Sequence, residues 1–278
     1  MTLGEVLRGA ADYLERKGVA SPRLDAELLL SRALGLSRIE LYTQHDKPLS
    51  EAERTAAREL VQRRGSREPL AYVLGDWGFR RLVLATDARA LVPRPETEIV
   101  VERALVAIAD LETPRVLDIG TGTGAIALSI ADEHPGAAVS ASDISPDALA
   151  LARENATRLG LDVTFVESDL LTAVDGLFDL VISNPPYVTE AEVADLQPEV
   201  RDWEPRIAVV GTQTGEIASS ARSVIAAGGV LVLETHTDLA GEAATLLRGL
   251  GYIDVQITRD LTGRERVVEG RWTTSSGL

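Results

Sequence analysis

An amide, two prolines and a phenol follow an apolar run in the segment LVISNPPYVTE, residues 180–190. The run predicts a buried strand, and prolines cannot extend a sheet ladder, so the strand must stop there. The residues just beyond its end are Asn184, Pro185, Pro186 and Tyr187. An asparagine oxygen and a neighbouring backbone carbonyl can accept both hydrogens of a planar –NH2 group, while a tyrosine ring packs on its face. The stretch therefore predicts a site that grips an amine or amide nitrogen.

A second candidate site is the glycine-rich loop in LDIGTGTGAIALS, which separates a predicted strand from a predicted helix. Its residues are Gly120, Thr121, Gly122, Thr123 and Gly124. The spacing G-x-G-x-G differs from the G-x-G-x-x-G that seats a dinucleotide pyrophosphate. We expect the carboxylate of Asp118 to face the loop, where it would disfavour a phosphate and suit the ammonium group of S-adenosylmethionine. A tight turn without a ligand is the alternative, but the pattern favours a methyl-donor site.

Acidic residues at the ends of two further strands complete the predicted donor site. Asp143 ends the run AVSASDI, 19 residues beyond Gly124. In doubly wound folds a carboxylate at this place binds ribose hydroxyls. The alternative is a charge at a helix N-terminus, because DISPDAL also begins a helix. Asp169 and Leu170, after the third strand, are expected at the edge and face of an adenine.

The elements that must position these residues alternate between strand and helix from residue 114 onward. Such alternation is typical of an α/β fold, an open and mainly parallel sheet with helices on both faces. Ligands of these sheets bind beyond the carboxyl ends of the strands, at the point where the strand order reverses. We therefore expect the glycine loop, Asp143 and Asn184 in one crevice. The segments YIDVQITRD and RERVVEGRW are expected to close the chain as an antiparallel pair.

The first part of the chain has a different sequence pattern, one without alternating strands and helices. Helical spacing, a Ser-Pro start at Ser21 and a serine cap at Ser50 predict a small helical bundle. Short β-like runs then follow in PLAYVLGDWGFRRLVLATD. We predict a helical domain over 1–70, a β-hairpin linker over 71–90 and a catalytic domain over 91–278.

Composition narrows the classes of function. The chain has no cysteine, and its three histidines fall in unrelated segments, so we expect neither a metal site nor a histidine base. Residues 1–75 carry 12 basic and 11 acidic residues, whereas residues 76–278 carry 16 basic and 32 acidic ones. A domain as acidic as residues 76–278 is a poor binder of duplex DNA, because it repels the phosphates. Without a signal peptide or a long apolar run, the sequence predicts a cytoplasmic protein without membrane contact.

These motifs together resemble the HemK/PrmC family, which methylates the glutamine of the Gly-Gly-Gln motif in peptide-chain release factors. N-P-P-Y is also found in N6-adenine DNA methyltransferases, but EPLAYVLGDWGF (68–79) and LVPRPETE (91–98) closely match this family. The resemblance implies a class I S-adenosylmethionine-dependent methyltransferase, with a doubly wound, seven-stranded, mostly parallel sheet. It also implies that the helical domain docks the substrate protein.

The resemblance further implies roles for individual residues. The glycine loop would line the methionine part of the donor, with S-adenosyl-L-homocysteine as the product, and Asp143 would bind ribose. Asn184 through Tyr187 would hold the glutamine amide, and Asn184 would border the donor as well. Residues that would shape the same cavity are Pro93, Arg94 and Pro95. Leu170 stands where the family often has an aromatic residue, which implies weaker stacking on the adenine.

The implied partner is a peptide-chain release factor bound by a monomeric enzyme. A glutamine methyltransferase of a ribosomal protein shares the fold and N-P-P-Y and is the first alternative. An N6-adenine nucleic-acid methyltransferase is the second, although the acidic domain counts against it. A donor-binding protein without catalysis is the third, and Asn184 and Tyr187 argue against it.

Overall fold

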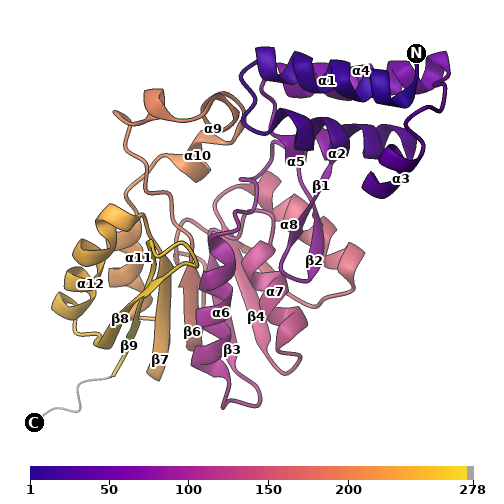
Figure 1. Ribbon diagram of the computed structural model, residues 1–278. Helices are drawn as coiled ribbons and strands as arrows, with labels where there is room; N and C mark the ends of the chain where they lie inside the picture. The colour runs from indigo at the N-terminus through magenta and orange to yellow at the C-terminus, as the bar shows by residue number, and fades with distance from the viewer. Residues whose placement is uncertain (274–278) are drawn as a thin grey trace, which may run out of the picture. The chain divides into compact units, whose positions relative to one another are not determined.

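The computed structural model describes residues 1–273, which divide into two compact units (Figure 1). The first unit comprises Met1–Asp76 and Gln197–Trp203, and the second comprises Trp77–Leu196 and the chain from Glu204 onward. The last five residues of the predicted catalytic domain lie outside the described part of the chain. Within that part, no helix combines the length and the apolar character needed to cross a membrane.

The first unit is helical, as its sequence predicts. Its helices are α1 (Leu3–Arg16), α2 (Pro22–Leu34), α3 (Arg38–Thr43), α4 (Glu51–Gly65), α5 (Leu70–Leu74) and α9 (Pro198–Trp203). Helix α2 begins at the predicted Ser-Pro start, and Gly35 ends it in the left-handed conformation. Helix α4 begins with a capping box, in which the Ser50 hydroxyl accepts from the N–H of Glu53 and the Glu53 carboxylate accepts from the N–H of Ser50.

Residues 70–74 correct the prediction of β-like runs in this region, because they form helix α5. Pro69 directly precedes the helix, and Gly75 ends it with a φ of +79°. The apolar run is short, and a short run has the same pattern in a buried strand and in a buried helical turn. The hairpin itself is shorter than predicted and consists of β1 (Asp76–Phe79) and β2 (Leu82–Ala85).

The second unit is built on one seven-stranded sheet with the order β5-β4-β3-β6-β7-β9-β8. Its strands are β3 (Arg115–Ile119), β4 (Ala138–Asp143), β5 (Thr164–Glu167), β6 (Phe178–Ser183), β7 (Ile225–Glu234), β8 (Ile253–Arg259) and β9 (Glu265–Arg271). The first five strands of that order pair in parallel, and β9 pairs antiparallel with both neighbours. The predicted fold class, including the closing hairpin pair, is confirmed.

Helices cover both faces of this sheet, because successive strand residues point to opposite sides. Val116 on β3 packs in a core with α6 (Thr97–Ile108), α7 (Ala125–Glu133) and α8 (Pro146–Leu159). Leu117 packs in the other core with α11 (Thr214–Ala221) and α12 (Ala240–Gly249). Figure 1 shows α6 and α7 across the sheet from α11 and α12. The remaining described helices are α10 (Arg206–Val209) and the 3₁₀ turns Val193–Asp195 and Thr237–Leu239.

The register of the central strands determines where the candidate residues lie. Ile119, the last residue of β3, pairs with Ser142 on β4 and with Ser183 on β6. The Ser183 hydroxyl also donates to the Ile119 carbonyl at 2.7 Å. Because the three strands are parallel and end together, the residues that follow them meet at one edge of the sheet. At this edge the strand order reverses, because β4 lies on one side of β3 and β6 on the other, as the sequence predicts.

A buried ion-pair network lies inside the first unit. Arg64 pairs with Asp25 at 2.7 Å and with Glu199 of α9 at 2.8 Å, and Arg67 pairs with Glu199 at 2.5 Å. The side chains of Arg64 and Asp25 are each only 7% exposed. Burial raises the pKa of Asp25, and the hydrogen bond from Arg64 opposes that shift. The network joins α9, which lies far along the chain, to helices α2 and α4.

Replacing Arg64 with alanine is expected to lower the free energy of unfolding by about 3–5 kcal/mol, because buried carboxylates would lose their cation. Arg32→Ala is a matched control, since Arg32 pairs with Asp76 through side chains that are 52% and 30% exposed. An exposed pair of this kind contributes about 1 kcal/mol or less. Urea unfolding followed by circular dichroism measures both variants, and equal losses would contradict a stabilising role of the buried network.

Candidate functional site

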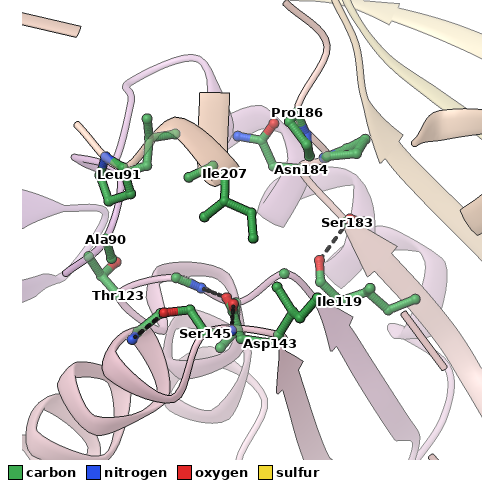
Figure 2. A pocket seen from close by; sticks show the side chains of 18 of the residues that line it. Ala90, Leu91, Ile119, Thr123, Asp143, Ser145, Ser183, Asn184, Pro186 and Ile207 are labelled. Atoms are coloured by element: carbon green, nitrogen blue, oxygen red, sulfur yellow. Dashed lines mark hydrogen bonds between the residues drawn. The ribbon is translucent and has the colours of Figure 1, made fainter. Parts of the chain in front are cut away.

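A cavity opens at the edge where β3, β4 and β6 end, entirely within the second unit. Its empty volume is about 1050 Å³, part of which is open to solvent. The predicted site residues that line it are Pro93, Arg94, Gly120, Thr121, Gly122, Thr123, Asp143, Asp169, Leu170, Asn184, Pro185 and Pro186. The four predicted residues outside its lining are Pro95, Asp118, Gly124 and Tyr187. Figure 2 shows Asp143 and Ser145 on one side of the cavity, with Asn184 and Pro186 across from them.

The glycine loop turns sharply from β3 into the cavity. The N–H groups of Gly120 and Thr121 both donate to the Ser142 carbonyl, at 2.8 and 3.0 Å. Gly120 and Gly122 have φ values of +73° and +55°, which glycine adopts without strain. No atom lies within 4 Å of the place where a Cβ of Gly120 would stand. The backbone conformation therefore explains this glycine, and the space beside it remains open to a ligand.

Asp143 is held by the backbone around it. Its two carboxylate oxygens accept from the N–H groups of Gly122 and Ser145, each at 2.9 Å. Burial raises the pKa of Asp143, and these hydrogen bonds to the charged form oppose the shift. The backbone of Ile144 also contacts the carboxylate, so three of its roughly four acceptor positions are used and at least one remains for a hydroxyl. A carboxylate that can still accept a hydrogen bond suits the hydroxyls of a ribose.

Asp118 lies beneath the loop and does not face the cavity. The residue is fully buried, and the Thr121 hydroxyl donates to its Oδ2 at 2.7 Å. Burial raises the pKa of Asp118 to about 7, against the hydrogen bonds from Thr121 and from the backbone of Ala127. Its Oδ1 has no hydrogen-bond partner among the described residues. The observed contact supports the loop from below, while a role toward the donor's ammonium group stays a prediction.

Asn184 lines the cavity with one half of its amide already engaged. Its Nδ2 donates to the Thr97 hydroxyl at 3.3 Å, and no described residue donates to its Oδ1. Pro185 and Pro186 have no backbone N–H, so they leave no donor to compete for nearby carbonyls. The arrangement presents acceptor oxygens to a ligand, as a grip on an –NH2 group requires.

Tyr187 lies against the end of β7. Its ring centroid is 6.0 Å from that of His236, with the rings tilted by 42°. Burial raises the pKa of Tyr187, and the negative charge of Glu234 adds to the shift. The predicted packing of this ring on a substrate stays a prediction.

Two arginines line the cavity, and both are paired with carboxylates. Arg94 holds Glu204 with 2.7 and 2.5 Å contacts, and Arg89 holds Asp87 and Glu154 at 2.7 and 2.9 Å. Because their charges are neutralised in place, the lining offers little attraction for a phosphate. This supports the methyl-donor interpretation of the loop over a dinucleotide site.

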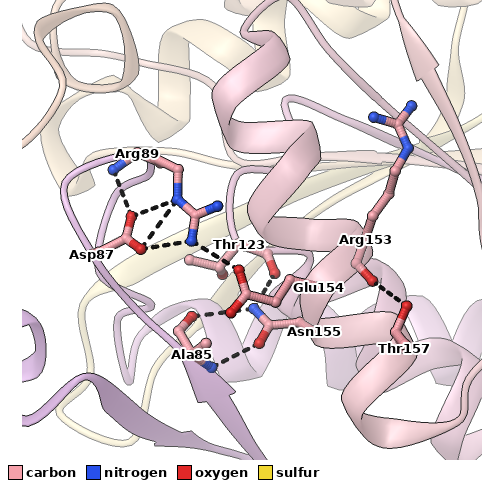
Figure 3. Close-up of polar contacts among 8 residues, drawn as sticks. All are labelled: Ala85, Asp87, Arg89, Thr123, Arg153, Glu154, Asn155 and Thr157. Carbon is pink, nitrogen blue, oxygen red and sulfur yellow. Dashed lines mark hydrogen bonds and ion pairs between the residues drawn. The ribbon is translucent and has the colours of Figure 1, made fainter.

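Sequence reasoning missed three buried residues that support the site, namely Thr97, Asn155 and Glu234. Asn155 accepts from the N–H of Ala85 at 2.7 Å and donates to the carbonyls of Ala85 and Thr123 at 3.1 and 2.9 Å (Figure 3). It thereby ties α8 to β2 and to the glycine loop. Two features of the sequence could have pointed to Asn155. The chain has only two asparagines, and this one lies on the apolar face of α8.

The fold and this crevice define a class I methyltransferase, an enzyme that uses S-adenosylmethionine. Two family models match the chain, "PrmC N-terminal domain" over residues 5–75 and "Methyltransferase small domain" over residues 97–198. A Pyrococcus furiosus methyltransferase has the same fold, with 18% identity, a TM-score of 0.50 and coverage of 69% of this chain and 89% of that one. A 16S rRNA methyltransferase of T. thermophilus also has it, with 18% identity, a TM-score of 0.54 and coverage of 70% and 49%.

The chain belongs to the release factor glutamine methyltransferase family. It is 43% identical to the Deinococcus radiodurans protein of that name, over 98% of this chain and 99% of that protein. The Chlorobaculum tepidum protein is also 43% identical, with 94% of each chain covered. The Salmonella typhimurium protein is 41% identical over 91% of this chain and 93% of its own. The family resemblance stated from the motifs is thus confirmed.

Asp143→Asn is expected to weaken binding of S-adenosylmethionine by about tenfold or more, because a donor –NH2 would replace one acceptor oxygen beside backbone N–H groups. Isothermal titration calorimetry measures the dissociation constant. Asp147→Asn is the control, since Asp147 is an exposed carboxylate in the first turn of the same helix α8. An unchanged constant for Asp143→Asn would contradict the ribose role.

Asn155→Ala is expected to lower the free energy of unfolding by about 2–4 kcal/mol, because buried backbone groups of Ala85 and Thr123 would lose their partners. Thr157→Ala serves as the control, since the exposed Thr157 hydroxyl donates only to the Arg153 carbonyl of its own helix. We expect a change of about 0.5 kcal/mol or less there. Chemical denaturation measures both, and a small effect at Asn155 would show that the loop does not depend on it.

Proposed function

We propose that the protein transfers a methyl group to the side-chain amide nitrogen, N5, of the glutamine in the Gly-Gly-Gln motif of a peptide-chain release factor. The observation that carries the proposal is the state of Asn184, whose Nδ2 is engaged by Thr97 while its Oδ1 is left for a ligand. Membership of the release factor glutamine methyltransferase family supports the choice of substrate.

The chain's own groups address the main difficulty of the reaction. An amide nitrogen is a poor nucleophile, because its lone pair is delocalised into the carbonyl. Asn184 Oδ1 and the Pro185 carbonyl would each accept one N–H of the glutamine amide and so fix the direction of the nitrogen. Such positioning contributes up to roughly 7–11 kcal/mol for ideal geometry. The same acceptors stabilise positive charge as it develops on the nitrogen. The surplus proton would then leave to water.

The residues present fit S-adenosylmethionine. Asp143 would hold the ribose hydroxyls, and the open backbone of Gly120 and Gly122 would receive the methionine part. Leu170 lines the cavity where the adenine face is expected. When bound, the cofactor supplies an electrophilic methyl group on a sulfonium centre and is left as S-adenosyl-L-homocysteine.

The first unit is proposed as the part that docks the release factor. The match of residues 5–75 to the PrmC N-terminal domain supports this role. Its charge is nearly balanced, with 12 basic and 11 acidic residues over 1–75, so the strongly acidic character is confined to the catalytic part. A folded protein partner is therefore a better fit for this unit than for the acidic remainder.

Asn184→Ala is expected to lower kcat for release factor methylation on the order of 10²–10³-fold, comparable to losing one group of an oxyanion hole. Its stability should change little, because Asn184 is only half-buried and follows the end of β6. Mass spectrometry of an intact release factor after incubation with enzyme and donor measures the methyl gain on glutamine. Thr189→Ala, an exposed change in the same loop, is the control.

Parallel reactions with a Gly-Gly-Gln peptide, ribosomal proteins and adenine-containing DNA separate the alternatives. Methylation of the intact factor well above the free peptide supports both the chemistry and the docking role. Equal rates on both would remove the docking role, and methylation of a ribosomal protein or of adenine instead would overturn the proposed substrate. Full activity of Asn184→Ala would overturn the amide grip.

A further inference from the structure

Asn184 has an amide whose two ends are nearly equal in size but opposite in hydrogen bonding. The proposed reaction needs the oxygen toward the substrate, because only an acceptor can hold a substrate N–H. Rotation of the amide by half a turn would present an –NH2 group instead, and the site would then repel the same substrate. Something in the surroundings must therefore favour one orientation.

The group that contacts this amide is Thr97, the first residue of α6. The residue is 5% exposed, and its N–H donates to the Arg94 carbonyl at 3.0 Å, so its backbone is fixed. A β-branched side chain on a helix has few rotamers, which restricts the hydroxyl further. The Oγ1 lies 3.3 Å from Asn184 Nδ2.

A hydroxyl can donate only one hydrogen, and an ionised carboxylate within reach takes it, because such a group can only accept. The Glu234 side chain ends β7 and is 2% exposed. Burial raises the pKa of Glu234 to about 7, and a hydrogen bond from the Thr97 side chain opposes that shift because it stabilises the ionised carboxylate. When Glu234 is ionised and takes that hydrogen, the Thr97 oxygen is left as an acceptor, which agrees with the 3.3 Å contact from Asn184 Nδ2.

We infer that Thr97, directed by Glu234, is a positioning residue that sets the orientation of the Asn184 amide for catalysis. An acceptor at Thr97 Oγ1 pairs with the –NH2 end of Asn184, which leaves Oδ1 for the substrate. The three residues come from α6, the end of β7 and the end of β6, all within the second unit. This inference rests on the proposed function, because it assigns a support to the same amide grip.

Thr97→Val tests it by replacing the hydroxyl with a methyl group of nearly equal size. We expect kcat for release factor methylation to fall about tenfold to 10²-fold, as for a small misplacement of a reacting group. The KM for the factor and the dissociation constant of S-adenosylmethionine should stay within about twofold, because ground-state binding is not what the hydroxyl controls. Thr97→Ser keeps the hydroxyl and should restore most of the rate.

Glu234→Gln provides a second variant, which also serves if Thr97→Val does not fold. Because a glutamine amide can donate or accept, it no longer directs the Thr97 hydrogen. We expect a smaller fall in kcat than for Thr97→Val, with KM for the factor and the dissociation constant of S-adenosylmethionine again unchanged. Ser129→Ala is the control for the loss of a buried hydroxyl on a helix, since Ser129 is fully buried on α7 and its Oγ has no partner among the described residues.

The outcomes distinguish this inference from the proposed function. If Asn184→Ala abolishes methylation while Thr97→Val or Glu234→Gln keeps the full rate, the positioning role is wrong and the amide grip stands. If kcat/KM of Thr97→Val falls entirely through a higher KM, the positioning role is also overturned. The same holds if Thr97→Ser does not restore the rate. Full activity of Asn184→Ala would overturn the grip itself and the inference with it.

Discussion

The parallel register at Ile119 is the constraint on which the whole site depends. This residue pairs with Ser142 on one side and Ser183 on the other, so the chain segments that follow β3, β4 and β6 emerge side by side. A shift of one residue in either pairing would move Asp143 or Asn184 away from the glycine loop and would turn its strand over. The Ser183 hydroxyl, bound to the Ile119 carbonyl, adds a side-chain contact at this point of the register.

The two asparagines of the chain show how the same side chain serves structure or function. Asn155 is fully buried, and both ends of its amide are bound to backbone groups of β2 and the glycine loop. Asn184 has one end bound and the other left toward the cavity. Satisfying every polar group gives stability, whereas a held amide with one open acceptor gives a preorganised binding group. Which of the two roles applies depends on the neighbours, not on the residue type.

The parts of the site that follow local rules could be predicted from the sequence. The glycine loop, Asp143 and Asn184 each stand directly after an apolar run, and parallel strands bring such positions together. Thr97, Glu204 and Glu234 could not be found this way, because their roles arise from packing between segments far apart in the chain. Asp118 was placed on the correct strand and next to the loop, where the Thr121 hydroxyl donates to it, while its role toward the donor stays a prediction. Residues 70–74 were mistaken for strand because so short an apolar run has no distinguishing period.

The proposed grip on a planar nitrogen does not by itself select glutamine, since an exocyclic amine of a base presents the same two hydrogens. Selection must come from what surrounds the grip. Arg89 and Arg94 reach the cavity but are neutralised by Asp87, Glu154 and Glu204, so a phosphate beside the nitrogen would gain little there. Residues 76–278 carry twice as many acidic as basic residues, which adds repulsion at longer range. The electrostatics around the site thus disfavour nucleic acid and are consistent with the proposed substrate, an uncharged side-chain amide.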